Sequence, residues 1–313
     1  MEDKYLEAVS VCPVCSSGNH TKFIATPALM HHTEDTFSFS CCGQCNAAFL
    51  NPRVTTDHLK TYYPDYYLPY RGAAAWGKYR GFVDRSQQKM DKKRLKTCKK
   101  FGSKNTGPIK LLDVGCGNPT FLQTLSQNTD WQLTGIDFTD EGWKNSGNLS
   151  FKLITGDVQA MELAEKFDLV TMWHYLEHDY NPNKTLASLR KHLKTGGKVI
   201  IEVPDYLSLT AKWQQAHWEG WHTPRHTLLY TKSAFERLAA SNGYKLLKHY
   251  RYGTLDAFTL WWMGTMEKKK ANWAGSMETE FFPLVWKKVY TAPLFMLEKW
   301  LPLGIQTVVL EAV

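Results

Sequence analysis

The sequence predicts an α/β protein in which a parallel, helix-covered sheet follows a small cysteine-rich module. From Ile109 onwards, short apolar runs alternate with stretches of helical periodicity, which is typical of such a sheet. Residues 1–55 instead contain two Cys-x-x-Cys pairs and little periodic apolar pattern. The length of 313 residues fits one large domain plus a smaller module.

The composition is that of an ordinary globular protein. Apolar residues make up 43% and charged residues 22%, which excludes a wholly disordered or fibrous chain. The net charge of +8 permits an anionic partner but does not identify one. The first residues carry no signal-peptide pattern, and no apolar run reaches about 18 residues. We therefore expect a cytoplasmic protein without a spanning helix.

The first predicted unit, residues 1–55, is a zinc-ribbon-like module. Its two Cys-x-x-Cys pairs supply four candidate ligands: Cys12, Cys15, Cys42 and Cys45. The 26 residues between the pairs let two loops offer four thiolates to one tetrahedral Zn²⁺. Such a site is closed to substrate, so the zinc is expected to be structural. Cys41 is an alternative ligand to Cys42.

Residues 56–105 are predicted to link this module to the sheet. A tyrosine-rich stretch comes first, comprising Tyr62, Tyr63, Tyr66, Tyr67 and Tyr70. Eight lysines and arginines follow between Lys89 and Lys104, opposed only by Asp91. We interpret this basic run as a linking helix with a solvated face.

Seven β-rich runs predict the strands of the large domain, residues 106–313. They span residues 109–114, 132–136, 151–154, 167–172, 198–203, 244–250 and 306–310. Helices are expected between them. Residues 183–193 carry a leucine stripe, and residues 233–242 open with a capping box that runs from Ser233 to Glu236.

Residues 253–304 form an insertion before the last strand that is too long for a simple connection. It contains five tryptophans, interrupted by lysines and prolines. Two interpretations remain open: an apolar helical lid over a binding pocket, or an in-plane segment on anionic lipid.

The segment Leu111–Pro119, LLDVGCGNP, predicts a buried strand that runs through a glycine turn into a helix. Gly115 and Gly117 let the backbone approach a ligand closely. Asn118 is expected to cap the helix and Pro119 to occupy its first turn, so that free N–H groups face the ligand.

Two carboxylates follow at the next strand ends. Asp137 lies 20 residues after Gly117, where a carboxylate accepts hydrogen bonds from both ribose hydroxyls of a nucleotide. Asp157 lies 20 residues further on, where it would accept from an adenine amine while Val158 packs on the ring. A dinucleotide dehydrogenase is disfavoured, because Thr120 replaces the last glycine of Gly-x-Gly-x-x-Gly.

In the order of their motifs, residues 109–250 resemble class I methyltransferases that use S-adenosylmethionine. LLDVGCGNP is similar to their first motif, LTGIDF to the second, ITGDV to the third, FDLVTMWHYLEH to the fourth and LKTGGKVIIEVP to the fifth. CPVC, CCGQCNAAFLNPR and HWEGWHTPRHTLLYTKSAFERL resemble a bacterial branch with a cysteine-rich N-terminal module. Pro119 departs from the family, which has a glycine there.

The resemblance implies a Rossmann-like, seven-strand methyltransferase domain and S-adenosylmethionine as cofactor. Its motifs place the cofactor contacts at Asp113, Gly115, Cys116, Gly117, Asp137, Phe138, Asp157, Val158 and Trp173.

Methyl transfer from a sulfonium needs a base only when the acceptor carries a proton. The loop after the fourth strand would lie beside the methyl group, and we interpret His178 as the general base with Glu177 as its orienter. His174 and His226 are further candidates, and His226 with Arg225 would also suit an anionic acceptor. A packed structural role is the alternative for each histidine.

These features predict methyl transfer to a small-molecule or lipid-linked acceptor, at oxygen, by a protein that is cytoplasmic or peripheral at the inner face of a membrane. One alternative is an RNA or DNA methyltransferase, prompted by the zinc module and the basic run. WHYLEH stands where exocyclic-amine methylation would need an Asn/Asp-Pro-Pro-aromatic loop, which disfavours nucleic acid. Another alternative is a non-catalytic assembly protein that binds the cofactor.

Overall fold

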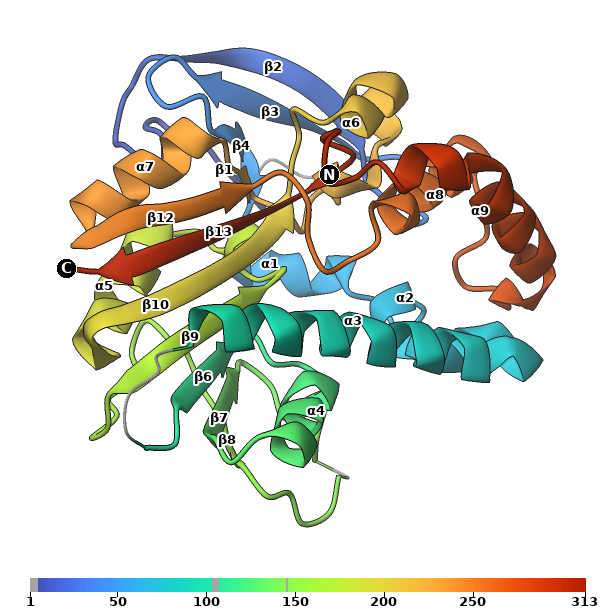
Figure 1. Cartoon of the computed structure of the whole chain (residues 1–313). Coiled ribbons are helices and arrows are strands. Elements are labelled where there is room, and N and C mark those ends of the chain that lie inside the picture. Colours follow the sequence, from blue (N-terminus) through green and yellow to red (C-terminus); the bar gives the residue numbers. More distant parts are fainter. Residues whose placement is uncertain (1–4, 103–106, 145) are drawn as a thin grey trace.

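The computed structural model describes residues 5–102, 107–144 and 146–313, and a seven-stranded sheet forms its centre (Figure 1). The strand order is β12-β13-β10-β9-β6-β7-β8. The strands are β6 (Lys110–Val114), β7 (Gln132–Asp137), β8 (Lys152–Thr155), β9 (Phe167–Trp173), β10 (Leu193–Pro204), β12 (Tyr244–Tyr250) and β13 (Ile305–Ala312). All seven predicted strands are confirmed. Only β10 differs by more than two residues, because it begins at Leu193 rather than 198.

One strand corrects the prediction of a parallel sheet: β13 runs antiparallel to both β10 and β12. The edge at which the chain re-enters the sheet explains this direction. The parallel strand β12 ends at Tyr250, on the carboxyl edge of the sheet, and the chain re-enters the sheet at Ile305, opposite Pro204 on that same edge. A strand that starts at the carboxyl edge has to run back against its neighbours.

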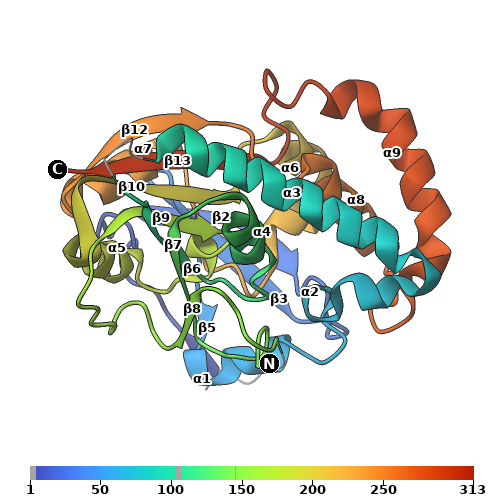
Figure 2. The ribbon, with the colours of Figure 1, turned by 60° about the horizontal axis from the view of Figure 1, so that its bottom comes forward.

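Helices cover both faces of this sheet (Figure 2). On one face, α3 (Arg80–Phe101) and α4 (Thr120–Asn128) pack on apolar residues of β6, β7 and β9. On the other, α5 (Pro182–His192) and α7 (Lys232–Ser241) pack on the opposite side chains of the same sheet.

The four predicted helices are present as α3, α4, α5 and α7, with corrected ends. The basic run belongs to α3, which starts nine residues earlier than predicted and buries Leu95, Cys98 and Phe101 against the sheet; residues 103 and 104 lie outside the described part. Asn118 and Ser233 do not cap their helices. α4 follows Pro119 without a side-chain cap, and the cap of α7 is the Thr231 hydroxyl, which accepts from the Ala234 N–H.

The cysteine module shares a core with the large domain. Its antiparallel sheet consists of β2 (His20–Pro27), β3 (Thr36–Cys42) and β4 (Ala48–Leu50), together with β11 (Leu228–Leu229) from the crossing after β10. A separate pair joins β1 (Leu6–Glu7) to β5 (Arg53–Val54). Phe49 and Cys45 lie in one apolar cluster with Leu238 of α7. The predicted boundary near residue 55 stays a prediction, but the two parts pack as neighbours.

Short helices line the remaining connections: α1 (Thr56–Leu59), α2 (Leu68–Arg71) and α6 (Leu209–Gln214). The insertion forms two longer ones, α8 (Ala257–Lys268) and α9 (Phe281–Phe295). α8 packs against the tyrosine-rich linker, whereas α9 lies at the outer edge of the molecule (Figures 1 and 2). Within the described residues, no helix combines the length and apolar character needed to cross a membrane.

Candidate active site

The glycine loop leaves β6 in a conformation that needs glycine. Gly115 and Gly117 have φ values of +72° and +46°. A Cβ on Gly115 would also lie 2.4 Å from the ring of Tyr175, so no larger residue fits there. Beneath the loop, the buried Asp113 accepts a 2.7 Å hydrogen bond from the Thr171 hydroxyl, and burial raises the pKa of Asp113 to about 7.

The next two carboxylates lie at the ends of neighbouring strands. Asp137 ends β7 and accepts a 2.9 Å hydrogen bond from the Gly117 N–H, which ties it to the glycine loop. Burial raises the pKa of Asp137, and this backbone N–H opposes the rise. Asp157 follows β8, and its Oδ1 accepts from the Gln159 N–H at 2.8 Å. Because β6, β7 and β8 are adjacent, one ligand across their carboxyl ends would meet all three loops.

The other predicted cofactor residues lie at different depths. Phe138 is 62% exposed at the rim. Cys116 and Trp173 are buried on the α3 side of the sheet, where Trp173 meets the ring of Phe121 edge-on. Val158 is buried in the core on the opposite side. Their contacts to a cofactor stay predictions.

His174 sits between two buried carboxylates. Its Nδ1 lies 3.3 Å from Glu177 Oε1 and its Nε2 lies 3.2 Å from Glu202 Oε1. Burial alone would lower the pKa of His174, but hydrogen bonds to both carboxylates raise it to about 9. Burial would raise the pKa of Glu202, yet His174 lowers it to about 2. His174 is therefore a cation at neutral pH, with no lone pair for a substrate proton.

His178 has the opposite character. Burial lowers its pKa, so the ring is neutral near pH 7. Its Nδ1 lies 3.1 Å from the Arg225 carbonyl oxygen, which can only accept, so we assign the ring hydrogen to Nδ1. Nε2 then keeps its lone pair. The carbonyl of Arg225, rather than Glu177 as expected, orients this ring.

His226 repeats that arrangement beside His178. Its Nδ1 lies 2.9 Å from the Gly220 carbonyl oxygen, and its Nε2 faces Glu177 Oε1 at 3.9 Å. Burial and the neighbouring His178 lower the pKa of His226 well below the usual value. The two rings meet edge-on with centroids 4.6 Å apart.

Glu177 occupies the centre of this group. Its side chain is fully buried, and its Oε2 has no hydrogen-bond partner among the described residues. An uncompensated buried carboxylate oxygen is costly, so it is suited to a donor on a bound molecule. Ligand atoms of Glu177, His178 and His226 also lie within 4.8 Å of one another, a set that could hold a metal ion.

Arg225 does not serve as a free anion-binding group. Its side chain is fully buried, and its guanidinium donates to the backbone carbonyls of Tyr62 and Leu29 and, through Nε, to His222 Nε2 at 2.8 Å. The expectation that Arg225 grips an anionic acceptor is therefore corrected. Arg225 instead joins the linker and the module to residues 219–226, which we call the crossing loop.

Three residues of this group were not predicted from the sequence. The Tyr67 hydroxyl lies 2.6 Å from His222 Nε2, and the Tyr63 hydroxyl lies 3.4 Å from His178 Nδ1. Their signal was the tyrosine-rich linker, to which no role was assigned. Glu202 had a clearer signal, because a carboxylate inside an apolar strand needs a buried partner.

The four predicted zinc ligands lie together. Cys12 Sγ lies 3.6 Å from Cys45 Sγ, and Cys15 Sγ lies 3.5 Å from Cys42 Sγ, with all four within 4.8 Å. Four sulfurs around one tetrahedral Zn²⁺ would be about 3.8 Å apart, so the set fits this metal. Cys41 lies outside the set, because neighbouring strand residues point to opposite faces.

Hydrogen bonds fasten this cysteine cluster to the large domain. The hydroxyls of Thr231 and Ser233 both donate to the Cys45 carbonyl, at 2.8 and 2.7 Å. The Asn183 amide donates to the Pro13 carbonyl at 2.8 Å. The crossing loop that carries His226 therefore rests on the cysteine module.

The family model described as a methyltransferase domain matches residues 85–249, which are 165 of the 313 residues. Two similar curated proteins are ubiquinone biosynthesis O-methyltransferases. The one from Pseudomonas fluorescens (strain Pf0-1) is 31% identical over 105 residues, 31% of this chain and 45% of that protein. The one from Idiomarina loihiensis is 31% identical over 100 residues, 29% of this chain and 41% of that protein. The chain thus spans less than half the length of these relatives.

Among solved structures, a mycolic acid cyclopropane synthase complexed with SAH and CTAB overlaps with a TM-score of 0.48 at 14% identity. The overlap covers 70% of this chain and 82% of that one. A likeness at this level carries no functional argument.

Proposed function

The chain belongs to the methyltransferase-domain family, and we propose that it transfers the methyl group of S-adenosylmethionine to an oxygen of a small-molecule or lipid-linked acceptor. The observation that carries this proposal is the pairing of two sites at one sheet edge. Glycines and carboxylates follow β6, β7 and β8, and a neutral, oriented imidazole lies after β9.

On the cofactor side, Asp137 would accept from the ribose hydroxyls and Asp157 from the adenine amine, while Gly115 and Gly117 let the loop approach. When bound, S-adenosylmethionine supplies a methyl group already activated by its sulfonium. The protein then has to align the two reactants and exclude water.

On the acceptor side, His178 Nε2 would take the proton of the acceptor hydroxyl as the methyl–oxygen bond forms. The Arg225 carbonyl holds the ring in the required tautomer. His174, as a cation between Glu177 and Glu202, would offset their negative charge. It would not accept the proton of the acceptor hydroxyl. His226 is the second candidate for the base.

An oxygen acceptor is favoured over carbon because two adjacent neutral imidazoles suit removal of a hydroxyl proton. The similarity to ubiquinone biosynthesis O-methyltransferases supports the same choice. We further propose that Cys12, Cys15, Cys42 and Cys45 hold a structural Zn²⁺, and that α8 backs the acceptor pocket. α8 contacts α6, where the Gln214 amide donates to the Trp261 carbonyl at 2.7 Å.

Calorimetric titration with S-adenosylmethionine, and separately with NAD, tests the cofactor. Binding of the methyl donor alone is expected, and binding of NAD alone would overturn the proposal. Transfer of labelled methyl groups to hydroxylated aromatic acceptors, with and without an isoprenoid tail, then tests the reaction. Cofactor binding without transfer to any of them would favour an assembly protein, and salt-sensitive RNA or DNA binding would favour a nucleic-acid substrate.

A further inference from the structure

The exposed side of α9 is built from large apolar side chains. Phe282 is 67% exposed, Trp286 72%, Val289 65% and Tyr290 79%. Their spacing of three and four residues places them on one side of the helix, which we call the α9 face. A surface helix ordinarily turns its polar side to water, so α9 has the reverse orientation.

Two lysines on the other side of α9 hold it in this orientation. Lys287 Nζ donates to Thr265 Oγ1 at 2.9 Å, and Lys288 Nζ lies 2.6 Å from Asp256 Oδ2. Both partners belong to α8 or to its N-terminal cap. Rotating α9 to bury its aromatic side chains would break both contacts, so their exposure is built into the packing.

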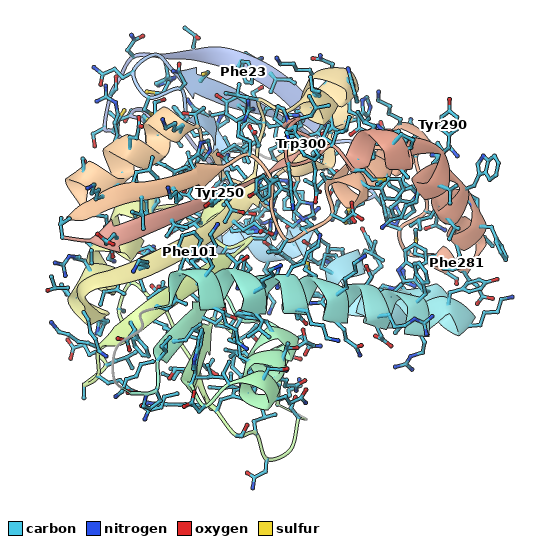
Figure 3. The ribbon with its side chains drawn as sticks, viewed as in Figure 1. Phe23, Phe101, Tyr250, Phe281, Tyr290 and Trp300 are labelled. Atoms are coloured by element: carbon cyan, nitrogen blue, oxygen red, sulfur yellow. The ribbon has the colours of Figure 1, made fainter. Side chains whose placement is uncertain are left out.

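Further exposed apolar residues follow α9 in the chain. Met296 is 76% exposed and Trp300 75% exposed in the turns that follow the helix. α9 stands at the outer edge of the molecule, with Tyr290 on its outer side (Figure 3). An exposed apolar patch of this kind marks a surface that another partner covers.

The charges around the α9 face identify the chemistry of that partner. Within residues 253–304, all of which the structure describes, the exposed charged residues are lysines: Lys268, Lys269, Lys270 and Lys299. The acidic residues of this segment are half-buried instead. Asp256 pairs with Lys288, and Glu267 accepts from the Met30 N–H at 2.8 Å. The exposed charge of the insertion is therefore positive.

We propose that the α9 face docks the protein on an anionic phospholipid surface. Tryptophan and tyrosine favour the boundary between headgroups and acyl chains, because one end of each ring is apolar and the other can hydrogen-bond. The helix would lie in the plane of this boundary, and the exposed lysines of the insertion outside α9 would meet the anionic headgroups. A second copy of this chain could cover the same aromatic side chains, but the exposed charge of its own insertion is also positive and gives the lysines no anionic partner.

This inference does not depend on methyl transfer, and its test needs no acceptor. The full chain is sedimented with phosphatidylcholine vesicles, with or without phosphatidylserine, at low and high salt. We expect binding to the anionic vesicles that weakens with salt, and little binding to phosphatidylcholine alone. No sedimentation with phosphatidylserine vesicles at low salt would overturn the proposal.

Substitutions on and away from the α9 face test whether this face binds the vesicles. Trp286→Ser with Tyr290→Ser should lower the vesicle partition coefficient at least about tenfold, since two aromatic side chains no longer leave water. Trp213→Ser is the matched control, because Trp213 is 52% exposed on α6, outside the insertion. Replacing Lys268, Lys269 and Lys270 by Gln should lower the partition coefficient on anionic vesicles roughly fivefold per lysine. The same change should leave partition on phosphatidylcholine vesicles unaltered.

Far-UV circular dichroism confirms that each variant is folded. Unchanged partition of the double variant, or an equal loss for Trp213→Ser, would overturn the assignment to α9. A native dimer in the absence of lipid that the double variant converts to monomer would assign the face to a second copy instead.

Discussion

The proposed cofactor side and the proposed acceptor side of this site are assembled in different ways. Apart from Trp173, the predicted cofactor contacts come from one continuous stretch, residues 111–158, with its carboxylates at successive strand ends. The acceptor side combines Tyr63 and Tyr67, the loop 174–178, Glu202 of β10 and the crossing loop 219–226. Cofactor contacts therefore depend on local backbone geometry, and acceptor contacts on how distant segments pack.

The difference also shows in burial and charge. Asp137 is half-buried and Phe138 is exposed at the sheet edge, whereas Glu177, Glu202 and Arg225 are fully buried. His174 lies between the two buried carboxylates. The cysteine module makes direct backbone contacts with the acceptor side, since β11 pairs with β4 and Arg225 donates to the Leu29 carbonyl. Substitutions that unfold the module should therefore impair acceptor binding more than cofactor binding.

Loss of the metal should produce the largest difference between the two sides, because it should impair the acceptor side and leave cofactor binding intact. Cys15→Ser together with Cys45→Ser is expected to abolish zinc content and to lower the free energy of unfolding of the module by several kcal/mol, on the order of 5. Methyl transfer should be lost while S-adenosylmethionine still binds. Elemental analysis and calorimetry check both. Cys41→Ser is the control and should keep its zinc; unaltered metal in the double variant would dismiss the zinc site.

Removing the proposed base tests the acceptor side alone. His178→Ala should lower kcat roughly 10²–10⁴-fold without changing cofactor affinity, because it removes only proton transfer. Activity of the native protein should persist below the ordinary histidine pKa of 6.5, since burial lowers the pKa of His178. Steady-state kinetics across pH measure both effects. A larger loss for His226→Ala than for His178→Ala would move the role of base to His226.

The ion pair between His174 and Glu202 gives the acceptor side a pH-dependent stability. The pKa of His174 is raised from 6.5 to about 9, so its contribution is complete below pH 6.5 and is lost as pH rises through 9. The pKa of Glu202 is lowered from 4.5 to about 2, so its contribution is complete above pH 4.5 and is lost as pH falls through 2. The pair stabilises most between pH 4.5 and 6.5.

His174→Gln should therefore remove a decline in the free energy of unfolding between pH 6.5 and 9, worth up to about 3 kcal/mol. Urea unfolding at pH 6 and pH 9 measures it. His32→Gln, which changes an exposed histidine, should leave the decline in place. The same pH dependence in His174→Gln and the native protein would refute the ion pair.

The smallest expected effect tests the cofactor side. Asp137→Ala should weaken S-adenosylmethionine binding by about 1.5–3 kcal/mol, because charge-assisted hydrogen bonds to the ribose and to the Gly117 N–H are lost together. Calorimetric titration gives the change. Asp140→Ala, an exposed carboxylate three residues away, should bind within about twofold of the native protein. Native-like affinity in Asp137→Ala would overturn the ribose assignment.

The sequence by itself determined the parts whose signals are local. Periodicity placed all seven strands, because strand and helix periods follow from backbone geometry alone. Spacing placed the four cysteines, since two short loops can each present two thiolates wherever the rest of the chain runs. Gly115, Gly117, Asp137 and Asp157 follow adjacent strands for the same local reason.

Only the tertiary structure decided the rest. The direction of β13 depends on where the insertion returns to the sheet, and the protonation of His174 and His178 depends on carboxylates and carbonyls far away in the chain. Tyr63, Tyr67 and Arg225 gain their roles through contacts across more than 100 residues. Burial and long-range partners set a side chain's charge and exposure, and residue type and spacing do not encode either.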